Sequence, residues 1–152
     1  MWPVWFAVLF GSIFAAYSAM DIPQRQSQAI QIAADVSATN FIAYRSTVQQ
    51  YLSANPSATG VIDDSALTPY WKPGYIRNTA WTNLIVGNAL YVYANGAVAA
   101  NTLDSLHQKS RENVLFGTKD ASNGRLISYN GFDTGIGLPG SIPNNAIVMI
   151  GR

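Results

Sequence analysis

Residues 1–20 carry no charged side chain, and this feature constrains the chain more than any other. From Trp2 to Met20 the sequence reads WPVWFAVLFGSIFAAYSAM, in which most residues are aromatic or aliphatic. A helix rises about 1.5 Å per residue, so this run would cover roughly 28 Å, close to the thickness of a bilayer's hydrocarbon core. The run therefore predicts a transmembrane anchor in a lipid bilayer, with the anchor residues Trp2, Trp5, Phe6, Leu9, Phe10, Ile13, Phe14 and Tyr17.

A cleaved secretory signal is the competing interpretation of this segment. Such a signal has a basic region ahead of a shorter apolar core, followed by a cleavage site of the small-x-small type. No Lys or Arg precedes Arg25, and the best cleavage sequence is Ala16-Tyr17-Ser18. We therefore expect a retained anchor that spans the membrane once, with the bulk of the chain translocated.

A long amphipathic helix is predicted after the anchor, from Gln24 to Asn55. Pro23 lacks the N–H group that would continue a helix, so a kink or restart is expected there. The helix should end at Asn55-Pro56, because the residue before a proline avoids the α region. Apolar and small residues recur at three- and four-residue steps, which indicates a face packed on the chain's own domain or a stalk packed on other subunits. These residues are Ile30, Ala33, Ala34, Ser37, Phe41, Tyr44, Val48, Tyr51 and Leu52.

The remaining sequence is typical of a small α+β domain with a mostly antiparallel sheet and one further helix. One or two strands are expected over 83–93, a helix over 97–110, and a hairpin from 113–119 and 125–129. Residues 135–143 are rich in Gly and Pro and are expected to form a loop, before a last apolar strand over 146–150. The predicted organisation is a transmembrane anchor (1–20), an amphipathic helix (21–55) and an α+β domain (56–152).

The charge balance excludes some classes of partner. Nine basic and eight acidic residues give a net charge of +1, which offers no basic surface for nucleic acid. Charged residues make up 11% of the chain, well below the usual share, and Asn, Ser, Thr and Gln supply the polar surface instead. This composition suits an exported domain.

One short motif has the letters of a catalytic site. Asp133-Thr134-Gly135 is the triplet of aspartic proteases, whose chemistry needs two carboxylates that share a proton. The chain has no second such triplet, and a turn rather than an apolar strand precedes this one. The favoured interpretation is a turn in which the aspartate caps local amides. A membrane-bound aspartic peptidase remains the less favoured alternative.

No metal or cofactor site is predicted either. Gly135, Gly137 and Gly140 match the spacing of a dinucleotide fingerprint, but no helix can follow them, so they are expected to be loop residues with positive φ. His107 is the only histidine and the chain has no cysteine, which leaves no usual zinc ligand set. The chain is therefore not expected to be an enzyme.

Aromatic residues are concentrated between residues 70 and 81, with Lys72 and Arg77 among them. Such a cluster either fills a small core or forms a binding face, since Trp and Tyr are favoured at interface hot spots. Both interpretations stay open. The possible partner-binding residues are Tyr70, Trp71, Tyr75, Arg77 and Trp81.

Four segments of the chain resemble a known family. They are WKPGYIRN (71–78), ALYVY (89–93), NGRLI (123–127) and SIPNNAIVMIG (141–151), and they are similar to the PilM proteins of the thin-pilus (type IVB) systems of conjugative plasmids. The N-terminal apolar segment and the chain length agree with that family. The resemblance implies a protein of the bacterial inner membrane that is needed for pilus assembly, in the basal body or the pilin transport apparatus. It implies no catalytic or ligand residue.

The sequence therefore predicts a membrane-anchored structural component of a type IV (thin) pilus biogenesis machine, with its C-terminal domain in the periplasm. Expected partners are other pilus-assembly proteins of the inner membrane and periplasm, the major pilin and further copies of the chain. A minor-pilin-like subunit of the fibre is the alternative. A processed prepilin has a basic leader and a glutamate five residues after the cleavage point, whereas Ala16 stands at that place after Gly11. The anchor is therefore expected to stay uncleaved.

Overall fold

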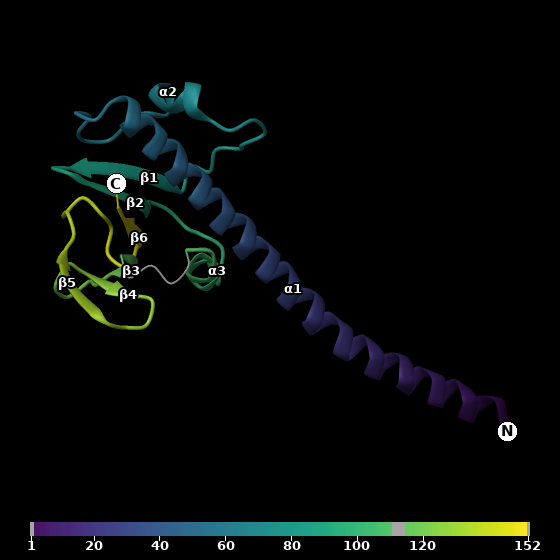
Figure 1. Cartoon of the computed structure of the whole chain (residues 1–152). Helices are drawn as coiled ribbons and strands as arrows, with labels where there is room; N and C mark the ends of the chain where they lie inside the picture. The colour runs from purple at the N-terminus through teal and green to yellow at the C-terminus, as the bar shows by residue number, and fades with distance from the viewer. Residues whose placement is uncertain (1, 111–114, 152) are drawn as a thin grey trace.

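The computed structural model describes the backbone of residues 2–110 and 115–151, and the side chains of residues 8–10, 24–110 and 115–151. One long helix leads into an α+β domain (Figure 1). The helices are α1 (Trp2–Ala54), α2 (Asp64–Leu67), the 3-10 helix η1 (Thr68–Tyr70) and α3 (Thr102–Lys109). The strands are β1 (Trp81–Val86), β2 (Ala89–Ala94), β3 (Phe116–Lys119), β4 (Arg125–Ser128), β5 (Asp133–Gly137) and β6 (Ile147–Ile150).

Helix α1 is a single element of 53 residues that projects well beyond the domain (Figure 1). The expected break at Pro23 is wrong, because the helix continues through this residue. A proline within a helix removes one backbone hydrogen bond. The hydrogen bonds of the turns before and after it remain, so the helix can continue through it. The helix ends at Ala54 as expected from Asn55-Pro56, and Asn55 donates both its backbone N–H and its side-chain amide to the Tyr51 carbonyl.

The six strands form one antiparallel sheet in the order β1-β2-β6-β3-β4-β5. Strand β6, the last of the six in the sequence, lies between β2 and β3 and joins the β1–β2 hairpin to the β3–β4–β5 meander. Gly117 of β3 lies so close to the carbonyl of Ile127 on β4 that no Cβ would fit there. The α+β fold with a long helix and an antiparallel sheet is therefore confirmed.

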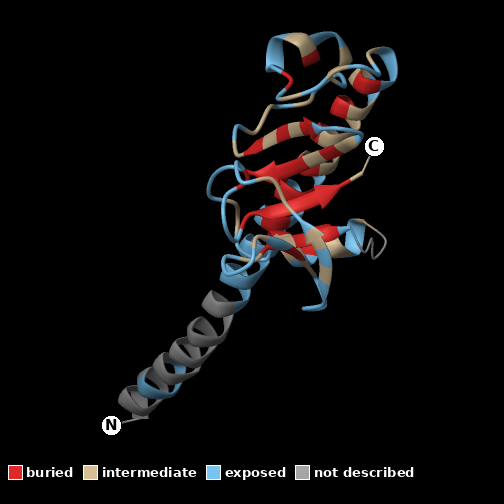
Figure 2. Ribbon diagram, turned by 90° about the vertical axis from the view of Figure 1, so that its left-hand side faces the viewer, coloured by how far each residue is buried: buried red, intermediate tan, exposed pale blue. Residues whose placement is uncertain are grey.

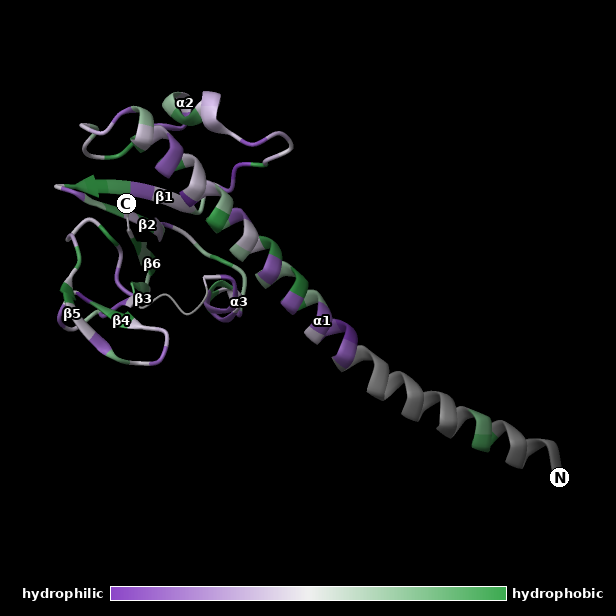
Figure 3. Cartoon of the chain, viewed as in Figure 1, coloured by the Kyte–Doolittle hydropathy of each residue, from purple (hydrophilic) through white to green (hydrophobic). Residues whose placement is uncertain are grey.

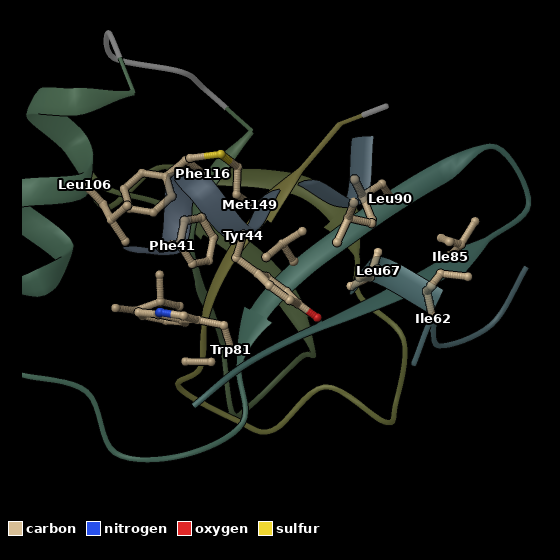
Figure 4. Packing of buried hydrophobic residues seen from close by; sticks show 14 of the residues in the cluster. Phe41, Tyr44, Ile62, Leu67, Trp81, Ile85, Leu90, Leu106, Phe116 and Met149 are labelled. Carbon is tan, nitrogen blue, oxygen red and sulfur yellow. The ribbon is translucent and has the colours of Figure 1, made fainter. Parts of the chain in front are cut away.

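The second half of α1 packs across one face of the sheet. Residues 24–33 are exposed, and from Ala34 onward one side of the helix is buried (Figure 2). Of the expected stripe, Ile30 and Ala33 are exposed, while the residues from Ala34 to Leu52 are buried or partly buried. The core that they enter also holds Trp81, Leu106, Phe116 and Met149 (Figure 4), together with Val92.

The opposite face of the sheet carries a second, smaller core. Because side chains alternate along a strand, Tyr93 and Val148 point away from α1, whereas Val92 and Met149 point toward it. The second core contains Tyr93, Leu126, Ile142, Ala146, Val148 and Ile150. The loop after β5 covers this face, which explains why the strand β6 is apolar on both sides.

Several element boundaries differ from the sequence expectations. The expected strands over 83–93 form the β1–β2 hairpin, with Gly87 in the left-handed region at φ 59°. The helix expected over 97–110 begins only at Thr102, and residues 133–137 form an edge strand where a loop was expected from 135. Of the three fingerprint glycines only Gly135 has a positive φ, so the expectation for Gly137 and Gly140 is wrong.

The membrane-spanning prediction receives no support from the structure. Within the residues described, no helix is both long enough and apolar enough to cross a bilayer. Leu9 and Phe10 of the expected anchor are exposed. They belong to a short apolar segment, residues 8–10, which is green within the otherwise grey N-terminal part of α1 (Figure 3). The side chains of the other anchor residues lie outside the described residues, namely Trp2, Trp5, Phe6, Ile13, Phe14 and Tyr17.

Candidate functional site

The aromatic cluster folds over α1 as an ordered stack of rings. The Trp71 ring lies between Tyr75, at a centroid distance of 4.8 Å and an interplanar angle of 9°, and Tyr44 of α1, at 6.0 Å and 23°. Tyr70 meets Tyr51 of α1 edge to face at 5.7 Å. These contacts explain why an irregular segment with two prolines keeps one conformation, since stacked and edge-to-face pairs add stability beyond buried area.

Arg77 braces this stack rather than pointing into solvent. Its guanidinium lies 4.3 Å from the centre of the Tyr44 ring, which is a cation–π contact. Its Nε donates to the two carboxylate oxygens of Asp64 at 2.9 Å each, and Nη2 donates to the Trp81 carbonyl at 2.7 Å. Arg77 therefore links α2, the stack and the start of β1 within the domain.

Tyr75 has a hydrogen-bonded hydroxyl and a raised pKa. The hydroxyl donates to Oδ1 of Asn40 at 3.0 Å, and the Asn40 side-chain amide donates to the Ile76 carbonyl at 2.7 Å. Burial raises the pKa of Tyr75 to about 12, because the charged phenolate would lose its hydration. Burial is also the main cause that raises the pKa of Tyr44. Both tyrosines are therefore neutral at physiological pH.

A buried asparagine, which the sequence did not single out, organises the floor of the stack. Asn83 of β1 donates to the Tyr44 hydroxyl at 2.8 Å and to the Ile62 carbonyl at 3.0 Å, and its Oδ1 accepts the Ile62 N–H at 2.8 Å. The side chain is fully buried, so these bonds replace those it would make with water. The sequence hints at this role only in that Asn83 is a polar residue within a mostly apolar strand.

Trp81 differs from the other residues of the cluster. Its side chain is fully buried and packs edge to face on Phe41 of α1 at 4.8 Å (Figure 4). In this structure Trp81 is a core residue and offers no surface to a partner. Tyr70, Trp71, Tyr75 and Arg77 are partly exposed, and their binding role stays a prediction.

The exposed part of this region centres on a residue missed by sequence reasoning. Ile76 follows Tyr75 and is 82% exposed, the highest value among the large hydrophobic residues whose side chains the structure describes. Val61 is also exposed. We call the surface formed by Tyr70, Trp71 and Ile76 the aromatic surface. In the sequence, Ile76 is visible only as an aliphatic residue between Tyr75 and Arg77.

A model of the PilM family matches residues 9–150, which include most of α1 and all six strands. The chain belongs to the PilM family. The resemblance drawn from the four sequence segments is thus confirmed, and PilM proteins are pilus biogenesis proteins.

Two solved structures that carry the PilM name are similar to the chain. The one from Escherichia coli B7A has a TM-score of 0.58 and 24% sequence identity, and the match covers 83% of this chain and 94% of that one. The one from Pseudomonas aeruginosa 2192 has a TM-score of 0.41 and 25% identity, over 78% of this chain and 95% of that one. The first similarity supports the PilM fold. No curated protein matches the chain.

In this PilM-family chain, the Asp133 triplet lies in the edge strand β5, so the expected turn is wrong. Asp133 Oδ1 accepts the Gly135 N–H at 2.8 Å, and Oδ2 lies 3.4 Å from Nη1 of Arg125. Thr134 donates its hydroxyl to the Leu126 carbonyl at 2.8 Å. The carboxylate therefore caps a local amide, which agrees with the capping part of the favoured sequence interpretation.

His107 packs against an aromatic ring. Its imidazole stacks on Tyr129 with the centroids 3.8 Å apart. Among the described residues no group of three or more His, Cys, Asp or Glu side chains could hold a metal ion. His107, which belongs to α3, therefore packs on the residue that follows β4.

Proposed function

We propose that the chain is a non-enzymatic structural component of a thin-pilus biogenesis machine. The observation that carries this proposal is the PilM family match, because it runs through both the long helix and the sheet domain. The geometry supports a docking role. The helix, the sheet and the aromatic stack pack on one core, and the apolar side chain of Ile76 is exposed beside the stack.

The proposal includes anchorage in the bacterial inner membrane, with the sheet domain in the periplasm. The support is the absence of charge from residues 1–20 and the exposed apolar side chains of Val8, Leu9 and Phe10. Alkaline extraction of membranes should leave the chain in the pellet, and mass spectrometry should find its N-terminal segment intact. A product that begins at Ser12 or Ala19 would contradict the retained anchor.

The aromatic surface is the proposed contact with other assembly proteins. A photo-crosslinking residue at position 76, in cells that make the pilus, should give crosslinks to inner-membrane or periplasmic assembly proteins. Phe132 is 67% exposed beyond β4 and serves as the matched control position. Equal crosslinks from both positions would mean that the aromatic surface has no special role, and none from either would remove the docking proposal.

A second candidate is a minor-pilin-like subunit of the fibre. It is favoured by the plan of the fold, in which a long N-terminal helix packs its second half on an antiparallel sheet, as in type IV pilins. This is an analogy of fold alone. Sheared pili should lack the chain if it is a machine component, and contain it if it is a fibre subunit. Crosslinks mainly to the major pilin would also favour the fibre subunit.

A further inference from the structure

The side of α1 that points away from the sheet carries an exposed apolar ridge. Ile32 is 65% exposed and Val36 is 62% exposed, and Ala29 is exposed as well. Residues three and four apart share one side of a helix, so these three residues form a single ridge. Ala34 and Phe41 enter the core, and Val36 lies about half a turn from Ala34. The ridge is therefore on the side of α1 opposite to the sheet.

Two parts of the domain border this ridge and leave it open. On one flank α3 approaches the helix, and Lys109 Nζ lies 2.8 Å from a carboxylate oxygen of Asp35. On the other flank the Asn40 side-chain amide donates to the Ile76 carbonyl at 2.7 Å. Between these contacts the ridge runs toward the part of α1 that projects beyond the domain (Figure 1). A second helix can therefore lie along it.

The spacing of the ridge continues toward the N-terminus with a period of seven residues. Every seventh residue of this series is aliphatic, and we call these residues together with Ile32 the α1 seam: Val8, Ala15, Ile22, Ala29, Ile32 and Val36. The structure describes the side chains of Val8, Ala29, Ile32 and Val36, and all of them are exposed. Such a period is typical of helices that wind around each other, with the repeated residues facing the partner helix.

The length of the α1 seam is what a stable helix pair needs. Exposed side chains at Ile32 and Val36 alone cannot bury the roughly 1,200 Å² of a stable interface. From Val8 to Val36 the seam spans four heptads, which is about 42 Å along a helix that rises about 1.5 Å per residue. Apolar heptads sustained over three to four repeats are typical of coiled coils. The whole seam, rather than its domain-proximal end, therefore has to take part.

The chemistry of the seam favours a second copy of the chain over a different helix. A seven-residue period matches itself in register when two copies lie parallel, so that each residue meets its own counterpart. Gly11 and Ser18 occupy the intermediate positions near the N-terminus, and small residues there let two membrane helices approach closely. Arg25 is the one charged residue of the series, and a single polar residue in such a seam sets the register at some cost in stability.

We propose that two copies of the chain pair in parallel along the α1 seam, with their sheet domains on the outer sides. The inference rests on the proposed function, because two anchors in one membrane hold the helices parallel and side by side. It adds the partner that covers this side of α1. The aromatic surface lies on the flank that carries Tyr44 and Tyr51, and other assembly proteins contact it there.

The first test is disulfide crosslinking of the full chain in membranes of cells that make the pilus. The chain has no cysteine, so one introduced thiol reports on one position. Copper phenanthroline takes up the electrons as two thiols lose their protons and form an S–S bond. Ile32→Cys should give a dimer. The control Gln24→Cys changes an exposed residue of the same helix outside the seam, and it should give about tenfold less, because the two Cβ atoms must come within about 4.5 Å.

The second test measures the mass of the full chain in detergent micelles by sedimentation. The unmodified chain should be a dimer, and Ile32→Glu should be a monomer, because two carboxylates would meet across the seam. Gln24→Glu adds the same charge outside the seam and should remain a dimer, as should Val36→Ala, which keeps the seam aliphatic. Ile32 lies outside the core, so the near-UV circular dichroism of Ile32→Glu should match that of the unmodified chain.

Several results would overturn the inference. Equal yields of dimer from Ile32→Cys and Gln24→Cys would show random encounters in the membrane. A monomeric unmodified chain, or an Ile32→Glu chain that stays dimeric, would show that the seam does not pair. Photo-crosslinks from position 32 to the major pilin instead of a second copy would show that a pilin helix occupies it. None of these results affects the crosslinks of position 76 to assembly proteins, so failure here is distinguishable from failure of the proposed function.

Discussion

Truncation of Phe41 to alanine tests the packing of α1 on the sheet. The side chain is fully buried and meets the Trp81 ring edge to face at 4.8 Å. Removal of a buried phenylalanine side chain costs about 3–5 kcal/mol of unfolding free energy, because a cavity is left where its contacts were. With a urea dependence of about 2 kcal/mol per M for a domain of this size, a loss of about 4 kcal/mol lowers the unfolding midpoint by about 2 M.

The assay is urea unfolding of the full chain, followed by near-UV circular dichroism of the packed aromatic residues. Val36→Ala is the matched control, since Val36 lies on the same helix and is 62% exposed, so its change should stay within about 0.5 kcal/mol. A loss below about 1 kcal/mol for Phe41→Ala, or a loss equal to that of the control, would show that α1 is not part of the core. That result would refute the account of the fold given above.

Three further predictions concern single residues. Asn83→Ala should lower the unfolding free energy by about 2–4 kcal/mol in the same assay, because it leaves buried partners unsatisfied, while Asn144→Ala, at an exposed asparagine, should have little effect. Gly117→Ala should prevent β3 from pairing with β4, which loss of slow amide exchange over these strands would reveal. The raised pKa of Tyr75, about 12 when folded against 10.0 unfolded, adds stability that is constant below pH 10 and is lost as the pH rises to 12. Tyr75→Phe should therefore make the alkaline loss of stability smaller, and an unchanged profile would contradict the assigned burial.

Local patterns were sufficient to predict much of the fold. Apolar residues of α1 between Ala34 and Leu52 are spaced with the period of a helix, and the helix face that they form is buried in the structure. One or two strands were expected over 83–93, and the structure resolves this into a hairpin in which Gly87 takes the left-handed conformation of the tight turn. The strand over 146–150 could be predicted because both of its faces are covered, so apolar residues follow one another along it.

Other features depend on contacts between distant residues. The strand order follows from the insertion of β6 between β2 and β3, which no local pattern encodes. Strand β5 is rich in glycine and forms only because β4 offers it an edge, so composition predicted a loop there. Propensity alone placed the start of α3 too early, before Asn101, which takes a left-handed conformation at φ 61°.

The candidate site, like the fold, was predicted in part from local sequence patterns, and the rest depends on contacts between distant residues. The aromatic residues between 70 and 81 were recognised as a cluster, and their alternative roles were stated. Which ring is core and which is partly exposed depends on Tyr44 and Phe41 of α1, about 30 to 40 residues away in the sequence. Asn83 was not recognised because its hydrogen bonds to Tyr44 and Ile62 join residues that are far apart in the sequence.

The position of β6 has a consequence for biosynthesis. A ribosome makes α1 first and β6 after every other strand, yet β6 is the strand that connects the two halves of the sheet. The hairpin and the meander can each form early, but neither can join the other until residues 147–150 have emerged. The contacts of α1 with Phe116 and Met149 therefore form later than those with Trp81 and Val92, so the part of its apolar face that lies over β3 and β6 is the last to be covered.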